Sequence, residues 1–275
     1  MPIPKSTELV TINYLDGIMR LRFFAFVVLF INLVLLMGCA TTGEDSLADE
    51  DLDKTAANIY REAKSALDKG DYETAIQRLE TLEARFPFGD YAQQAQLDIA
   101  YAYFKYDEPE SAVAAANRFI KLYPRHDNVD YAYYLKGLIR FNQGHSVFDK
   151  LASQDPAQRD PLTVRQSFQY FNELVTRFPA SRYVEDSRER MIYLRNNLAR
   201  YELYIARYYL NIGAYVAAAN RGKKIIESFQ LTPSVPEALV IMVLAYRKLG
   251  LNDLAMDSKA VLELNFPTHE VLAEL

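Results

Sequence analysis

An aromatic residue followed by proline recurs along this chain, and each such pair closes a stretch with the residue spacing of a helix. The pairs are Phe86-Pro87, Tyr123-Pro124, Phe178-Pro179 and Phe266-Pro267, with Phe229-Gln230 as a degenerate fifth member. Proline lacks a backbone N–H and clashes with the turn before it, so each pair predicts the end of a helix. A pattern that returns at a long period is typical of a repeat architecture.

Three further positions recur at fixed distances from these pairs. A small residue lies 12 positions before each proline or its equivalent, an apolar residue lies five before, and a second small or modest apolar residue lies 24 before. In chain order the three sets are Ala75, Ala112, Ser167, Ala218 and Ala255; Leu82, Phe119, Leu174, Ile225 and Leu262; and Ala63, Ala100, Gly137, Ala206 and Val243, of which Gly137 fits only after an insertion is removed. Small residues allow two helices to approach closely, and the apolar residues predict one buried stripe per helix.

The pattern resembles the tetratricopeptide repeat (TPR), a helix–turn–helix unit of about 34 residues. We therefore predict an all-α fold, a superhelix of about five TPR-like helix hairpins, with repeats one to three at 57–179 and repeats four and five at 180–275. The alternative is a generic helical bundle in which the proline spacing arises by chance. A stack of such repeats presents a concave face, which generally binds a protein or a peptide.

Two stretches exceed the ordinary repeat length. In repeat three the excess falls near 143–161, where Gly144, Pro156 and Pro161 predict a loop between the two helices. In repeat four, the run from Ser181 to Leu210 contains neither Pro nor Gly, which predicts one extended helix.

The first 38 residues have the pattern of a signal peptide, in which a basic segment (Arg20, Arg22) precedes the apolar run Phe23 to Met37. The start of translation is Met1 or Met19. The ending Leu36-Met37-Gly38-Cys39 resembles the lipobox of bacterial lipoproteins, in which the cysteine receives a diacylglycerol thioether and an N-acyl chain. The alternative is an ordinary membrane anchor, for which the run is short. Ala40 in place of Asp after the cysteine points to the outer membrane, with the chain on its periplasmic face.

Residues 39–56 predict an acidic tether. They carry Glu44, Asp45, Asp49, Glu50, Asp51 and Asp53 against the single basic residue Lys54. Low hydrophobicity and charge of one sign keep such a segment extended.

The sequence offers no chemistry of an active site. The whole chain has a net charge of −5, and the part after residue 38 has 28 basic and 34 acidic residues, so no basic surface for nucleic acid is expected. The three histidines (His126, His145 and His269) do not have the spacing of a metal motif, and no nucleotide-binding or nucleophile motif is present. We therefore predict a protein that is not an enzyme and holds no cofactor apart from the lipid on Cys39.

From about Tyr60 to the C-terminus the chain resembles the BamD family, the TPR lipoproteins of the β-barrel assembly machinery (the Bam complex). The stretches that carry the resemblance are Arg85-Phe-Pro-Phe-Gly89, Tyr91-Ala-Gln-Gln94, Gln96-Leu-Asp98, Tyr101-Ala-Tyr103, Arg118-Phe-Ile120, Asp130-Tyr131, Arg159-Asp-Pro161, Leu198-Ala-Arg-Tyr-Glu202, Gly213-Ala-Tyr-Val216 and Asn220-Arg221. The resemblance implies a role in inserting β-barrel proteins into the outer membrane. It also implies binding to the POTRA domains of BamA, to BamC and other Bam lipoproteins in enteric relatives, and to the C-terminal strands of unfolded β-barrel proteins.

Counting along the first helix of each N-terminal repeat gives a candidate cleft for a substrate peptide. The predicted lining residues are Tyr60, Lys64, Leu97, Tyr101, Phe104, Lys105, Tyr131, Tyr134 and Phe141, with Leu67 and Leu138 at related positions. Aromatic rings and two lysines suit a peptide with aromatic side chains and a terminal carboxylate. The alternative is that about half of these side chains only pack between repeats.

The C-terminal repeats are the predicted docking region for BamA, with Arg195 and Arg221 as candidate interface residues because Arg is enriched at interfaces. A rival reading is a TPR lipoprotein that serves as an adaptor for peptidoglycan enzymes. A second rival is a lytic transglycosylase, which needs a catalytic domain that the eight residues after Pro267 cannot supply.

Overall fold

The structure is a computed structural model that describes residues 44–143 and 161–275 of the chain. The candidate signal peptide, Cys39 and the predicted loop of repeat three lie outside the described residues. Residues 1–57 and 58–275 form two units, and the second contains the repeats.

The described residues are helical, and no strand occurs among them. The helices are α2 (Glu44–Lys69), α3 (Tyr72–Arg85), α4 (Asp90–Lys105), α5 (Pro109–Leu122), α6 (Val129–Gln143), α7 (Pro161–Arg177), α8 (Val184–Asn211), α9 (Tyr215–Ser228), α10 (Val235–Lys248) and α11 (Asn252–Asn265), followed by the short 3₁₀ helix η3 (Glu270–Glu274). The all-α prediction is confirmed.

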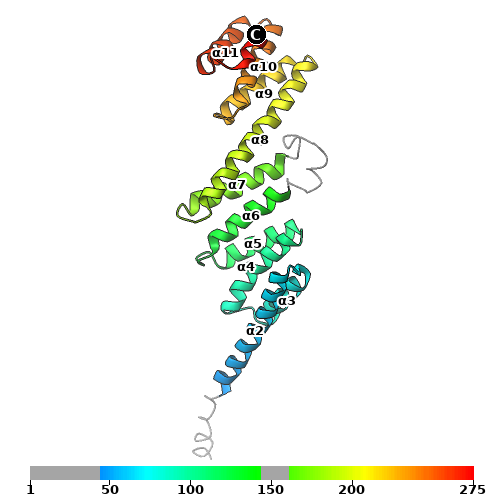
Figure 1. Ribbon diagram of the computed structural model, residues 1–275, viewed down its shortest axis with the longest axis vertical. Coiled ribbons are helices and arrows are strands. Elements are labelled where there is room, and N and C mark those ends of the chain that lie inside the picture. Colours follow the sequence, from blue (N-terminus) through cyan, green and yellow to red (C-terminus); the bar gives the residue numbers. More distant parts are fainter. Residues whose placement is uncertain (1–43, 144–160) are drawn as a thin grey trace, which may run out of the picture. The chain divides into compact units, whose positions relative to one another are not determined.

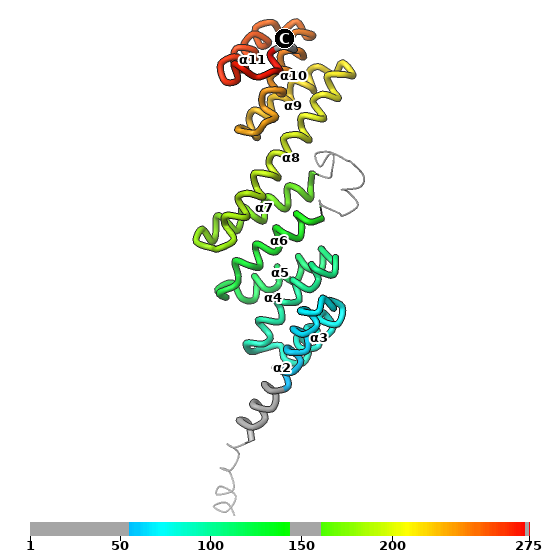
Figure 2. Tube along the Cα trace, in the orientation of Figure 1, coloured from blue at the N-terminus to red at the C-terminus, as the bar shows by residue number. Residues whose placement is uncertain are grey.

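Successive helices in residues 58–275 pair as hairpins, and each hairpin packs against the next (Figures 1 and 2). The hairpins are α2/α3, α4/α5, α6/α7, α8/α9 and α10/α11, and we call the first helix of each pair helix A and the second helix B. Helices α7 and α8 pack together across residue 179, so repeats three and four belong to one continuous stack.

The aromatic-proline pairs end the B helices as predicted. The backbone N–H of the aromatic residue donates to the carbonyl four residues earlier, as in Phe86 to Leu82 and Phe266 to Leu262. The apolar residue that provides this carbonyl is fully buried in all five hairpins. The same hydrogen bond therefore closes a helix over a core residue five times.

The small residues lie where helices A and B approach each other. Those on the B helices are buried, and so are those on the A helices. In the third hairpin the Ser167 hydroxyl donates to the Gly137 carbonyl at 3.0 Å, and a Cβ added at Gly137 would meet the Phe171 ring at 2.4 Å. Glycine is needed here because the neighbouring helix leaves no space for a side chain.

The structure tests both predictions about repeats that exceed the ordinary length. Helix α8 extends over 28 residues from Val184 to Asn211, which confirms the single long helix. Helix α6 ends at Gln143 and α7 begins at Pro161, so the predicted insertion falls between the two helices of repeat three.

The prediction of an extended tether is wrong for residues 44–56, because α2 already begins at Glu44. Leu, Ala, Glu and Lys in this segment favour a helix. Its acidic residues lie toward the helix N-terminus, where the helix dipole stabilises negative charge. Among the described residues, no helix has both the length and the apolar character required to cross a bilayer.

We predict that Gly137→Ala destabilises the chain by about 1–3 kcal/mol, because the new methyl group overpacks against the Phe171 ring. Chemical denaturation of wild type and variant measures the change. In the double variant Gly137→Ala/Phe171→Leu, the loss should be smaller than the sum of the two single losses, since the smaller side chain relieves the clash. Simple additivity would contradict this account of the contact.

Candidate functional site

A set of aromatic side chains, most of them on A helices, packs against two neighbouring core clusters of the N-terminal hairpins. We call the set the aromatic face; it consists of Tyr60 on α2, Tyr101 and Phe104 on α4, Tyr131, Tyr134 and Phe141 on α6, and Tyr183 before α8. All seven are half-buried. Tyr183 stacks on Tyr134 with ring centroids 4.6 Å apart and also contacts Tyr131. Six of the seven were predicted; Tyr131 packs against both core clusters, and Tyr134 and Phe141 both contact the Phe171 ring.

A tyrosine, an aspartate and a lysine join the first two hairpins on this face. The Tyr60 hydroxyl donates to Asp98 at 2.8 Å, and Lys64 Nζ lies 3.5 Å from the same carboxylate. Burial and the nearby Asp98 carboxylate raise the pKa of Tyr60 above its usual range. Lys64 is thus held at the edge of the aromatic face while its side chain stays 43% exposed.

The same arrangement recurs between the third and fourth hairpins. The Tyr134 hydroxyl donates to Asp186 at 2.7 Å, and Arg190 donates to that carboxylate at 2.6 and 3.1 Å. Burial and the hydrogen bond to Asp186 raise the pKa of Tyr134 to about 12. The Arg190 guanidinium also lies 4.7 Å from the Phe141 ring centroid, in cation–π geometry.

These contacts add residues that the sequence analysis missed. Asp98, Asp186, Arg190 and Tyr183 belong to the face, and the only signal for them in the sequence was the i,i+4 spacing of Asp186 and Arg190 on one helix. Repeat periodicity cannot reveal a contact between residues 38 or 52 positions apart, such as those made by Tyr60 and Tyr134.

The prediction that Leu97 lines the cleft is wrong. Leu97 is 3% exposed and packs in a core cluster with Phe119 and Leu174. It occupies the same repeat position as Tyr60 and Tyr134, but it has no hydroxyl to keep near solvent. An aliphatic side chain at this position therefore packs inward, whereas tyrosine places its polar end at the rim.

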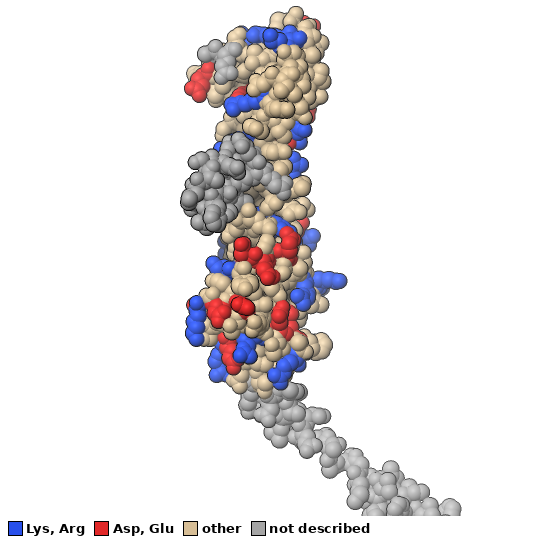
Figure 3. All heavy atoms as spheres, turned by 90° about the vertical axis from the view of Figure 1, so that its right-hand side faces the viewer, with Lys and Arg blue, Asp and Glu red and all other residues tan. Residues whose placement is uncertain are grey.

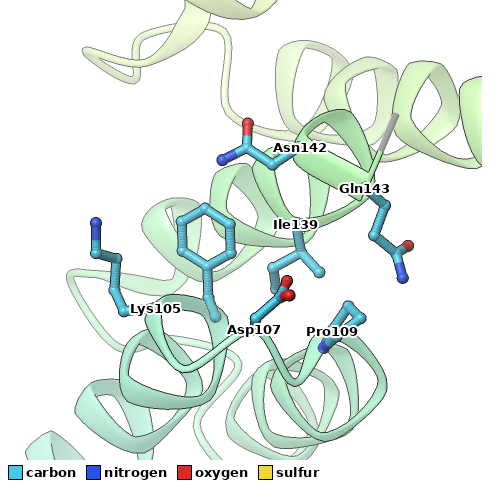
Figure 4. A pocket seen from close by; sticks show the side chains of 7 residues that line it. Lys105, Asp107, Pro109, Ile139, Asn142 and Gln143 are labelled. Atoms are coloured by element: carbon cyan, nitrogen blue, oxygen red, sulfur yellow. The ribbon is translucent and has the colours of Figure 1, made fainter. Parts of the chain in front are cut away.

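A small pocket of about 170 Å³ lies beside Phe104 and Lys105, between α4, α5 and α6 (Figure 4). Ile139 contributes apolar surface, and Asp107, Asn142 and Gln143 contribute polar groups. Asp107 has φ +65°, at the turn position where other hairpins have Gly70, Gly213 and Gly250. A residue other than glycine costs energy there, and such costs are often retained at binding sites.

Arg221, the predicted interface residue, belongs to a cluster around Glu202. Glu202 is 1% exposed and accepts hydrogen bonds from Arg221 at 2.7 Å, Lys224 at 2.6 Å and Arg165 at 3.5 Å. Burial alone would raise the pKa of Glu202, but the hydrogen bonds from Lys224 and Arg221 outweigh it and hold this pKa below its ordinary 4.5. Three cations around one carboxylate leave a surplus of positive charge at the surface.

Arg195 is half-buried on α8, and its Nε is buried without a hydrogen-bond partner in the described part of the chain. Nothing in its surroundings distinguishes it as a partner contact.

The turns between helices A and B differ between the two ends of the stack. The first two hairpins place Asp71, Glu73, Glu108 and Glu110 at these turns, whereas the last two have one acidic residue, Asp253, and place Ile212, Val216 and Leu251 there. We call these three exposed residues the turn patch; Val216 also lines an open pocket of about 470 Å³ with Tyr215 and Leu249. Figure 3 shows acidic and basic side chains intermixed over the lower hairpins and a broad uncharged area near the top, where Figure 1 places the C-terminal helices.

Comparison with known proteins identifies the family. A family model described as an outer membrane lipoprotein (YfiO) matches residues 52–262. The outer membrane protein assembly factor BamD of Neisseria meningitidis serogroup A is 49% identical over 233 residues, which cover 84% of this chain and 87% of the relative. BamD of Vibrio cholerae is 37% identical over 233 residues, which cover 85% and 95%. This chain belongs to the BamD family.

Solved structures add little to this assignment. A Podospora anserina putative kinesin light chain with TPR-like repeats has 14% identity and a TM-score of 0.34, with 76% of this chain and 92% of that chain covered. The BamD family membership therefore comes from sequence, and the TPR-like hairpins come from the helices described above. Among the described residues, no group of His, Cys, Asp and Glu is arranged to hold a metal ion.

We predict that Arg221→Ala weakens the pH dependence of folding stability. The lowered pKa of Glu202 means that this carboxylate stabilises the fold above pH 4.5, and the stabilisation is lost as pH falls through the lower pKa of the folded state. Removing one hydrogen bond to the buried carboxylate should cost about 1–3 kcal/mol at neutral pH and less in acid. Denaturation at about pH 7 and about pH 4 measures the difference.

Lys223→Ala on the same helix is the matched control, because among the described residues Lys223 pairs with exposed Glu227 alone. Such a surface pair contributes little. Equal effects of the two substitutions at both pH values would refute the role assigned to Arg221.

Proposed function

We propose that this BamD-family chain is a non-catalytic lipoprotein scaffold of the β-barrel assembly machinery. In this proposal, acyl chains on Cys39 hold it at the periplasmic face of the outer membrane. It binds a POTRA domain of BamA and the C-terminal strands of unfolded β-barrel proteins, and BamC and other Bam lipoproteins are further partners. Membership of the BamD family supports a role in the β-barrel assembly machinery at the outer membrane. The aromatic face is the observation that supports peptide binding.

The aromatic face suits a peptide strand with aromatic side chains and a free carboxylate. Its rings offer apolar surface whose polar ends remain at the rim, so a bound ring displaces water without stranding a hydroxyl. Lys64 and Arg190 are fixed by Asp98 and Asp186, yet both retain N–H groups for another acceptor. A terminal carboxylate therefore meets a cation whose position is already set.

BamA is the partner we assign to the C-terminal hairpins. The turn patch offers apolar surface, and the Arg165, Arg221 and Lys224 cluster offers positive charge for an acidic group of the partner. Apolar anchors combined with Arg are typical of the centres of protein interfaces.

The peptide proposal predicts that the effect of removing Lys64 depends on the free carboxylate of the peptide. A peptide that ends in an aromatic residue with a free carboxylate should bind Lys64→Ala protein roughly tenfold more weakly than wild type, since a hydrogen bond to a charged group is lost. The amidated peptide should bind wild type equally weakly and lose nothing further with Lys64→Ala. Fluorescence anisotropy with the labelled peptides measures both affinities.

Lys121→Ala provides the matched control, because Lys121 is exposed on α5 and lies outside the aromatic face. Equal losses from Lys64→Ala and Lys121→Ala would mean that binding reflects only general charge attraction.

The anchoring and partner proposals are tested together in cells. A photo-crosslinking residue at position 221 should form an adduct with BamA, and one at position 101 an adduct with unfolded β-barrel proteins. Cys39→Ser should move the chain out of the membrane fraction and reduce the BamA adduct, because the local concentration gained by tethering is lost. An adduct at 221 with a peptidoglycan enzyme would favour the adaptor reading, and a membrane-bound Cys39→Ser chain would exclude the lipid anchor.

A further inference from the structure

The last helix, α11, reverses the pattern of the other B helices. Eight positions before the helix-ending proline or its equivalent, the internal hairpins have the buried residues Leu79, Ala116, Phe171 and Gly222, but α11 has Lys259, and its neighbour Met256 is 63% exposed. Polar substitution at a position that is buried in internal repeats is the mark of a capping repeat. Helix α11 therefore has the residue pattern of a capping helix.

The reverse change occurs on another side of the same helix. Six and three positions before the proline, the internal hairpins have Thr81, Arg118, Glu173 and Lys224, and Ala84, Lys121, Thr176 and Glu227. At these two positions α11 has Val261, 44% exposed, and Leu264, 82% exposed. Leu254, about two helical turns before Val261, is 45% exposed. We call Leu254, Val261 and Leu264 the α11 stripe.

The three residues of the α11 stripe share one helical face. Spacings of seven and three residues place them within about a quarter of a turn of each other, the width of an apolar seam between two helices. The buried residues Ala255, Ser258 and Leu262 lie on a different side of α11. The stripe is thus a second apolar surface, separate from the one that joins α11 to the stack.

Charge around the stripe indicates what kind of helix fits it. Asp257 lies between Leu254 and Val261 on the same face, and Asp253 is close by; both are exposed, and no cation of the described residues pairs with either. Lys259 pairs with Glu263 at 3.6 Å. A second copy of this chain would bring two more aspartates to the contact and no available cation, which costs energy.

We propose that the α11 stripe docks an amphipathic helix of another protein, one that carries Lys or Arg beside its apolar seam. The proposal is independent of the peptide-binding and BamA-binding surfaces described above, because it uses none of their residues. The partner is an apolar helix with a basic flank, because docking on the stripe would remove water from the Asp257 carboxylate and a cation would compensate that loss.

Site-specific photo-crosslinking of the full chain in cells tests this proposal. A photo-crosslinking residue at position 264 should give an adduct whose partner peptide, sequenced by mass spectrometry, lies in a helix with apolar residues at helical spacing and at least one adjacent Lys or Arg. The same residue at position 259, which lies roughly 140° around α11 from Leu264 and has a side chain that is 38% exposed, should not give that adduct.

Charge reversal provides the second measurement. Asp257→Lys should reduce the adduct from position 264 roughly tenfold or more by placing like charges together. Asp257 is exposed, so thermal unfolding should match wild type. An adduct joining two copies of this chain, an adduct with no basic residue near it, an unchanged yield in Asp257→Lys, or no adduct would each overturn the proposal. The Cys39, Lys64 and position 221 experiments would retain their own outcomes.

Discussion

The structure depends on close contact between the two helices of each hairpin. A small or modest apolar residue on helix A lies where helix B carries a small residue, and both are buried in every described hairpin. Because TPR-like hairpins bury their remaining apolar surface only against neighbours, each one needs the next. The third hairpin has the tightest version, with Gly137 against Phe171 and Ser167 bonded to the Gly137 carbonyl. This close approach sets the distance at which A-helix side chains of successive hairpins meet, and so it builds the aromatic face.

Much of this arrangement could be predicted from sequence, because it rests on residue size and periodicity. The ends of the B helices, the buried small residues and the long α8 follow from local patterns. Two features of the structure could not be predicted. One depends on contacts between residues far apart in the sequence, and the other on how a helix terminus stabilises charged residues. Leu97 and Tyr60 share a repeat position, yet one is in the core and the other reaches Asp98. The acidic start of α2 is predicted to be extended from its charge, yet it is helical, and the dipole at a helix N-terminus stabilises negative charge there.

The cations of the candidate sites share a physical logic. Lys64, Arg190 and Arg221 each bind a carboxylate of their own chain, and two of the three carboxylates belong to α8. Holding a long side chain in one geometry removes part of the entropy cost that a ligand would otherwise meet. The ion pairs reduce the net attraction for an anion, but they fix the donors that remain. Such sites favour ligands that match the geometry over ligands that merely carry charge.

Helix α8 also fixes the separation between the two candidate binding regions. Asp186 belongs to the aromatic face and Glu202 to the basic cluster, and both lie on this one uninterrupted helix. At 1.5 Å per residue they are roughly 24 Å apart along its axis. A helix without Gly or Pro in this span has no site for a sharp bend. The aromatic face and the basic cluster are therefore held at a set spacing, which a scaffold that used both as binding sites would impose on its two ligands.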